Sequence, residues 1–349
     1  MPVLQGVAQA LSGGLSGDMT GAGQFDIAAS GALAWIPGNP GRPAERSIVT
    51  VDASGRVSPW KSPLRDYSWL RVSPDGRQAA VTVLTNRERG LWLADMERGA
   101  LTPLLQRGEA EAPLWSLDGG HLTFHWLEGG RYLLARQAAD DSAQPEVLVD
   151  GWFHAESVGP DGELIGTSGT DASWDVGVVR VGDRERGIEP LIASPALEGW
   201  PVVSPDGQWL AYASNASGRY EVYVRPYPLR GPPTVVSLHG GISPVWHPGG
   251  GQIFFVEGAY VAQSKGRMIV VDFAAGAPPR VGCPRPLFEF DPTRLQFVCR
   301  PIRCYDVARD GQRFYAIHAP APPTSSVVTH VSLVQNWFHE LRAKVPVGR

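Results

Sequence analysis

Histidine, serine and acidic residues supply most catalytic centres, and their spacing in this chain predicts no familiar one. Eight histidines occur, but none forms the His-Glu-x-x-His pair that holds zinc on one face of a helix. No Gly-x-Ser-x-Gly segment offers a hydrolase nucleophile, and no Gly-rich phosphate loop, His-Arg-Asp or Asp-Phe-Gly indicates a kinase. We therefore predict no catalytic residue, no metal site and no cofactor, and favour a protein that is not an enzyme.

Thiol chemistry is equally limited. The three cysteines, Cys283, Cys299 and Cys304, all fall in the last fifth of the sequence and are too few for a disulfide framework. Free thiols and a single local disulfide both fit this pattern. A metal site built from thiols alone is not expected.

Composition and charge exclude several classes of partner. The 349 residues carry a net charge of −4, and no block of five or six Lys/Arg occurs, so no nucleic-acid surface is expected. No apolar stretch approaches the length of a membrane span, and the first basic residue is Arg42, so no signal peptide begins this chain. We expect a monomer of unassigned compartment.

A repeat organises the elements that must position any site. Ser73-Pro74-Asp75-Gly76 and Ser204-Pro205-Asp206-Gly207 are identical, and close copies end in Asp118-Gly119, Asp161-Gly162 and Asp310-Gly311. With the weaker copies ending at Gly31 and Gly250, the closing glycines are 45, 43, 43, 45, 43 and 61 residues apart. Aspartate accepts backbone N–H bonds in such turns and glycine adopts positive φ, so we predict structural roles for these pairs.

A period in the low forties, with an apolar run before each turn and further runs after it, suits four short strands. We predict an all-β single domain over 1–349: a seven-bladed β-propeller of four-stranded antiparallel blades, with six or eight blades as alternatives. Residues 2–7 would complete the last blade, and an insertion around 282–304 would stand over one face. The predicted blades are 24–60, 67–105, 111–149, 153–194, 199–237, 242–290 and 303–337.

The residues that precede each turn would surround the mouth of a propeller's central channel. Tryptophans with a few polar anchors are typical of a ligand pocket, although the tryptophans equally suit packing between blades. Arg71, Asp26 and Asp306 alternatively form an ion pair across the channel. The predicted ligand-binding set is Trp69, Arg71, Glu111, His154, Trp200, Arg303 and Tyr305.

The stretch SPDGQWLAYASNASGRYEVYVRPY, residues 204–227, resembles the TolB-like (WD40-like) β-propeller family, as do Tyr305-Asp306-Val307 and Asn336-Trp337-Phe338. More narrowly, it is similar to the propeller regions that follow the kinase domain in many bacterial serine/threonine protein kinases. The resemblance implies a periplasmic or extracytoplasmic sensor or interaction module that binds a protein, peptide or small ligand. His247-Pro248-Gly249-Gly250 departs from the pattern because it lacks the turn aspartate.

Two function classes follow. We favour a non-enzymatic recognition propeller of a bacterial signalling or envelope system. The alternative is an enzyme centred on the channel, such as a metal-assisted lyase or a hydrolase, because His125, His154, His247 and His318 fall in or beside the inner strands of different blades.

Overall fold

The computed structural model describes residues 9–11, 19–23, 25–35, 45–85, 88–170, 173–258, 265–299, 301–319, 331–335 and 337–344. The chain divides into two compact units. The main unit runs from Glu45 to Ala319, and the terminal unit combines Met1–Ala44 with Pro320–Arg349.

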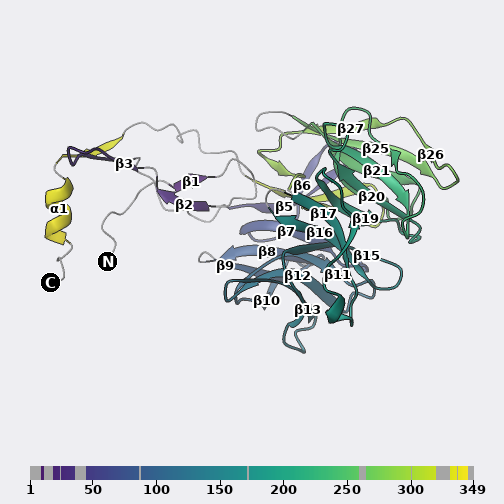
Figure 1. Ribbon diagram of the computed structural model, residues 1–349, viewed down its shortest axis with the longest axis horizontal. Helices are drawn as coiled ribbons and strands as arrows, with labels where there is room; N and C mark the ends of the chain where they lie inside the picture. The colour runs from purple at the N-terminus through teal and green to yellow at the C-terminus, as the bar shows by residue number, and fades with distance from the viewer. Residues whose placement is uncertain are drawn as a thin grey trace. The chain divides into compact units, whose positions relative to one another are not determined.

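The first four sheets of the main unit each contain four consecutive antiparallel strands (Figure 1). The strand order within each sheet follows the chain, as successive hairpins produce. A short 3₁₀ helix, η1 (Arg184–Arg186), precedes β18. The strands are β7 (Asp66–Val72), β8 (Gln78–Thr85), β9 (Glu88–Asp95) and β10 (Leu101–Leu105); β11 (Glu109–Trp115), β12 (His121–Glu128), β13 (Arg131–Ala138) and β14 (Glu146–Asp150); β15 (Phe153–Val158), β16 (Leu164–Thr170), β17 (Ser173–Val179) and β18 (Glu189–Ile192); and β19 (Glu198–Val203), β20 (Trp209–Ser214), β21 (Glu221–Pro226) and β22 (Thr234–Val235).

The fifth sheet has one strand more. β25 pairs with β24 on one side and with both β26 and β27 on the other, along different parts of its length. Its strands are β23 (Ile242–Trp246), β24 (Gln252–Glu257), β25 (Gly266–Ala274), β26 (Arg280–Val281) and β27 (Arg285–Phe290).

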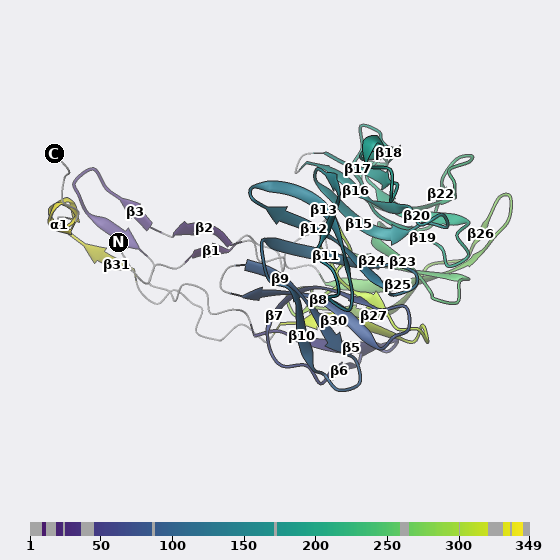
Figure 2. The same cartoon turned by 90° about the horizontal axis from the view of Figure 1, so that it is seen from below.

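The sixth sheet is assembled from both ends of the main unit. Its strand β30 (Arg313–His318) pairs with β29 (Asp306–Val307) and β28 (Leu295–Gln296) on one side. On its other side lies β5 (Ser47–Asp52), followed by β6 (Val57–Pro59). Figure 2 shows these strands beside β7 of the first sheet, which β30 contacts.

This arrangement corrects the predicted blade boundaries. Residues 24–60 do not form a sheet of their own, because 47–59 complete the sixth sheet and 25–35 belong to the terminal unit. Residues 332–334, which fall within the last predicted blade, pair with residues 33–35 of the terminal unit and not with β30, and residues 2–7 lie outside the described residues. Over the described parts of the main unit the strands therefore form six such sheets, where seven blades were predicted, with six or eight as alternatives.

The error has a local cause. The amide of Gly31 donates to the carbonyl of Ala28 at 2.8 Å, as the amide of Gly76 donates to the carbonyl of Ser73. Residues 28–31 thus form the same kind of turn as the true repeats. A turn motif reports a hairpin, and it carries no information about which sheet the hairpin joins.

The predicted turn chemistry is present at four of the five aspartates. The carboxylates of Asp75, Asp118, Asp206 and Asp310 each accept the backbone N–H two residues later, at 2.9 to 3.1 Å. At Asp161 the backbone N–H instead donates to the carboxylate of Glu163. The glycines that close these turns all have positive φ, as that position requires: Gly76, Gly119, Gly162, Gly207 and Gly311.

Apolar side chains pack between each sheet and the next along the chain. The sixth sheet also packs against the first, because Ile48 and Ile317 share one buried cluster with Tyr67 and Val81. In addition, the amide of Val72 in β7 donates to Asp306 Oδ2 at 2.9 Å. The core of the main unit is therefore a succession of intersheet layers that also joins its two ends.

The terminal unit is smaller. β3 (Phe25–Ile27), β4 (Leu33–Trp35) and β31 (Ser332–Val334) form one sheet, and β1 (Gln9–Leu11) pairs with β2 (Met19–Gly23). The helix α1 (Trp337–Lys344) begins where the amide of Trp337 donates to the carbonyl of Gly31. Within the described parts of the chain, no helix has the length and apolar character needed to cross a membrane.

Candidate functional site

One segment near the start of the sixth sheet is almost entirely buried. We call residues 295–299 and 301–305 the plug. Phe297, Ile302, Cys304 and Tyr305 are at most 2% exposed, and a disulfide joins Cys299 to Cys304. The insertion predicted to stand over one face is therefore partly interior.

The plug contacts the first strands of five sheets in turn. Cys299, Ile302 and Cys304 pack in one cluster with Trp69 of β7 and Ala112 of β11. The remaining contacts are hydrogen bonds: Gln296 Nε2 to the Ser68 carbonyl (3.0 Å), the Arg303 amide to Glu156 Oε2 (3.0 Å), Trp200 Nε1 to the Cys299 carbonyl (3.0 Å) and the Tyr305 hydroxyl to the Ser243 carbonyl (2.8 Å).

Three of these five strands contain a β-bulge with a residue at positive φ near the plug. Ala112, Trp200 and Ser243 occupy the same position, seven residues before a turn glycine, and have φ of 53°, 54° and 52°. The strand register shifts at each of them. Positive φ is uncommon for residues other than glycine, and a bulge redirects the strand locally. The bulges therefore interrupt the ladder at the level where the plug lies.

Two buried charged side chains anchor the plug. Arg71 donates from its two terminal nitrogens to the carbonyls of Leu70 (2.9 Å) and Arg303 (2.7 Å). Glu156 accepts from the Thr167 hydroxyl and the Arg303 amide, both at 3.0 Å. Burial raises the pKa of Glu156 to about 7 and lowers that of Arg71 to about 10, since desolvation disfavours the charged forms.

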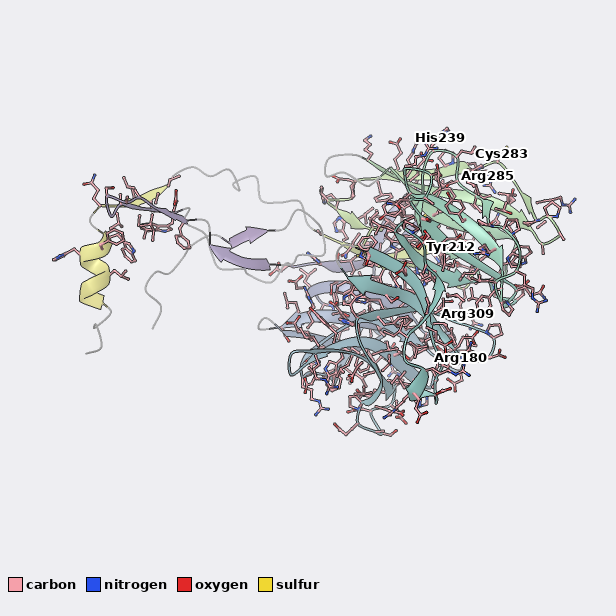
Figure 3. The ribbon with its side chains drawn as sticks, in the orientation of Figure 1. Arg180, Tyr212, His239, Cys283, Arg285 and Arg309 are labelled. Carbon is pink, nitrogen blue, oxygen red and sulfur yellow. A yellow bond between two sulfur atoms is a disulfide. The ribbon has the colours of Figure 1, made fainter. Side chains whose placement is uncertain are left out.

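An open hollow lies at the end of the main unit that carries the Asp-Gly turns. Its volume is about 490 Å³, which is within the usual range for ligand pockets. Arg309, labelled in Figure 3, donates from its guanidinium to the Asp75 carbonyl at 3.0 Å. The lining residues come from the first, fifth and sixth sheets: Val72, Ser73, Pro74, Pro248, Gly249, Asp306, Val307 and Arg309.

A second cluster lies at the opposite end, where the first strands begin. Glu111 of β11, His125 of β12 and His154 of β15 place one ligand atom each within 4.8 Å of the others. His125 Nδ1 is 3.5 Å from Glu111 Oε1, and the two imidazole rings are 4.4 Å apart between centroids. We call these three residues the rim cluster. Their types and proximity suit a divalent metal ion.

The chain is similar to solved TolB structures. A putative TolB from Agrobacterium tumefaciens aligns with a TM-score of 0.62 and 16% identity, over 80% of this chain and 99% of that chain. TolB from Acinetobacter baumannii aligns with a TM-score of 0.53 and 16% identity, over 81% of this chain and 66% of that chain. The chain has a TolB-like β-propeller fold.

Other comparisons add little to this assignment. An oligogalacturonate lyase from Vibrio parahaemolyticus aligns with a TM-score of 0.49 and 12% identity, over 84% of this chain and 82% of that chain, which is too low a similarity to suggest a reaction. No protein-family model and no curated protein matches this sequence.

The propeller buries most of the residues predicted to line a ligand pocket. Glu111 is partly exposed, whereas six are buried: Trp69, Arg71, His154, Trp200, Arg303 and Tyr305. Arg303 and Tyr305 belong to the plug, and Trp69, Arg71 and Trp200 contact it. The expected aromatic-walled opening is thus filled by the chain. Of the three residues predicted to form an ion pair across the channel, Arg71 and Asp306 belong to the main unit and Asp26 to the terminal unit.

Glu156 escaped the sequence analysis, and His125 was named only as part of the enzyme alternative. Glu156, which holds the plug, has no motif around it. His125 had been noted as an inner-strand histidine, but its pairing opposite Glu111 depends on strand register. The alternation of side chains along strands could have been used as a signal. Once β11 is aligned with β12, Glu111 lies opposite His125 on the same face. His154 then lies beside them, on the first strand of the next sheet.

Proposed function

We propose that this chain is a closed six-bladed β-propeller that recognises a protein or peptide and performs no reaction at its centre. Closure is supported by the sixth sheet, which combines β29 and β30 with β5 and β6. It is also supported by the packing of that sheet against the first one and by the bond from Val72 to Asp306. Closing a propeller with strands from both ends removes exposed sheet edges.

The observation that carries the proposal is the plug. A substrate channel needs open space at the axis, and here a disulfide-closed segment takes the hydrogen-bonding groups that four inner strands offer to the centre. Because the plug occupies the axis, a partner can bind only at one of the two ends of the propeller or on its outer surface. The recognition role is therefore assigned to an end surface.

The hollow at the turn end is the binding place that we propose. Val72, Pro74, Pro248 and Val307 give it apolar walls, while Asp306 and Arg309 place one charge of each sign there. Most of the exposed lining is nevertheless polar, so the hollow suits a partner that offers polar or charged groups beside its apolar contacts. Its size suits one or two side chains of a partner's loop or peptide, and a small molecule is the alternative occupant.

An oxidising compartment agrees with this role. The Cys299–Cys304 disulfide is buried, and structural disulfides persist mainly outside the cytosol. We propose an extracytoplasmic module of a bacterial signalling or envelope system, acting as a monomer and related in role to the propellers of bacterial serine/threonine kinases.

A second candidate function is a metal-assisted hydrolase or lyase, which the rim cluster favours. The two functions place the ligand at opposite ends of the propeller. Activity that depends on Glu111 would support the enzyme, and binding that depends on the hollow would support recognition.

The test replaces each of two prolines, which occupy equivalent turn positions, by tryptophan. Pro248→Trp fills the hollow, whereas Pro205→Trp changes the same position of the fourth sheet's turn, which does not line it. A library of synthetic peptides is screened against the full chain by thermal shift, since a ligand that binds the folded state raises the melting temperature. Peptides that bind are then titrated calorimetrically into the wild type and both variants.

We expect at least one peptide to bind the wild type and Pro205→Trp equally and Pro248→Trp at least about tenfold more weakly, a change of about 1.4 kcal/mol. Equal binding to all three proteins would contradict the hollow as the site. Turnover of a peptide or an oligosaccharide that Glu111→Gln abolishes would contradict the recognition role itself.

A further inference from the structure

The rim cluster contains buried nitrogen atoms without hydrogen bonds. Among the described residues, neither ring nitrogen of His125 has a hydrogen-bond partner, and the same is true of His154 Nδ1. Both histidines are only 3% exposed. Buried polar groups are normally satisfied by protein, water or an ion, so these unpaired ring nitrogens indicate a missing partner.

We infer that Glu111, His125 and His154 bind one divalent transition-metal ion, for which Zn²⁺ is the best match. Two imidazoles and one carboxylate are ligands that zinc and its first-row neighbours prefer. Three protein ligands leave one position of a tetrahedral ion for water or for an anionic group of a ligand. The site lies at the opposite end of the propeller from the hollow and does not depend on the proposed recognition role.

The distances fit a single ion. Ligand atoms about 2.1 Å from a tetrahedral zinc lie about 3.4 Å apart, and His125 Nδ1 and Glu111 Oε1 are already 3.5 Å apart. That separation is too long for a good hydrogen bond. The third ligand atom lies within 4.8 Å of the other two, so small side-chain rotations bring all three to bonding distance.

Neighbouring aromatic rings hold the two imidazoles in place. Tyr132 stacks on His125 at 5.3 Å between ring centroids, and Trp152 packs edge-on against His154 at 4.6 Å. Rings that are fixed by packing lose little entropy when a ligand binds.

The charges around the cluster leave one carboxylate oxygen available. Arg89 lies 3.4 Å from Glu111 Oε2 and 3.3 Å from Glu109 Oε2, so its guanidinium is shared between two carboxylates. Glu111 Oε1 faces the histidines instead.

The test measures metal binding directly on the full chain. The protein is dialysed against a chelator and then into metal-free buffer, and ZnCl₂ is titrated calorimetrically, with CoCl₂ as a spectroscopic probe of coordination. The variants are Glu111→Gln, His125→Gln and His154→Gln. The matched control is His239→Gln, an exposed histidine outside the cluster (Figure 3).

We expect one equivalent of Zn²⁺ to bind the wild type and His239→Gln alike. Each ligand variant should bind at least about 100-fold more weakly, because even second-shell changes cost about 10- to 100-fold. The visible absorption of bound Co²⁺ should be that of a four- or five-coordinate ion. Glu111→Gln changes a partly exposed residue, and circular dichroism verifies that it folds.

Two outcomes would overturn the inference. One is substoichiometric or absent zinc binding by the chelator-treated wild type. The other is equal affinity of the wild type and a folded Glu111→Gln variant, which would mean that zinc binds only at unrelated surface groups.

Discussion

Two glutamates on first strands of neighbouring sheets, Glu156 in β15 and Glu111 in β11, differ in how the protein surrounds them. Both oxygens of Glu156 accept hydrogen bonds, one from Thr167 and one from the Arg303 amide of the plug. Glu111 contacts Arg89 through one oxygen, while the other faces two histidines whose buried nitrogens lack hydrogen bonds among the described residues.

This difference provides a criterion that distinguishes structural polar residues of this propeller from residues that bind a ligand. A buried polar group with all its hydrogen bonds made fixes the fold, and one left incomplete is open to a ligand. By this criterion Glu156 at the centre of the propeller, where the sequence placed the site, is structural. Other buried polar atoms near the plug, such as Trp69 Nε1 and Gln296 Oε1, have no hydrogen-bond partner among the described residues. The rim cluster, where the sequence placed only Glu111 and His154, is open to a metal ion.

The largest expected effect is a pH-dependent gain of stability in Glu156→Gln. Burial raises the pKa of Glu156 from 4.5 to about 7, so the wild type has its full stability contribution from this group below pH 4.5 and loses it as the pH rises through about 7. Glutamine stays neutral throughout. The free energy of unfolding of the variant should therefore rise relative to the wild type by up to about 3 kcal/mol across this range.

Urea unfolding at a series of pH values between 4 and 8 measures this difference. Glu289→Gln, at an exposed position, is the control and should show no such trend. A difference between Glu156→Gln and wild type that is independent of pH would mean that the plug does not desolvate Glu156.

The second effect is the loss of the plug's covalent closure. Replacing Cys299 and Cys304 together by serine removes a crosslink with a sequence separation of five, and loop-closure entropy predicts a cost of about 2 kcal/mol. Cys283→Ser changes a free, exposed cysteine (Figure 3) and should leave stability unchanged. Thermal unfolding of the three proteins measures the cost. Equal melting temperatures would show that noncovalent contacts alone hold the plug.

Much of the fold could be predicted because its signals are local. The Asp-Gly turns near Gly76, Gly119, Gly162 and Gly207 mark the four sheets whose strands are consecutive, and hydrogen bonds within four residues determine those turns. The sixth sheet could not be predicted in this way. The pairing of β5 with β30 joins residues some 260 positions apart, and no turn residue records it.

The position of the plug could not be predicted from local sequence either. Its cysteines and the long step before Gly311 marked the region as unusual, but a loop above the propeller and a segment inside it have the same local sequence properties. Their difference arises from contacts with Ser68, Glu156, Trp200 and Ser243. Likewise, the grouping of His125 with His154 depends on packing between two sheets, which the spacing along the chain does not reveal.

The smallest expected effect sharpens the contrast between the two glutamates. In metal-free protein, Glu111→Gln removes a partly exposed partner of Arg89, and such ion pairs contribute under about 1 kcal/mol. With saturating zinc the wild type should gain stability and the variant should not, since only binding to the folded state shifts unfolding. Urea titrations with chelator and with zinc measure both quantities. A loss of several kcal/mol in the metal-free variant would place Glu111 among the structural residues, beside Glu156, because its surroundings would then depend on the carboxylate without any ion.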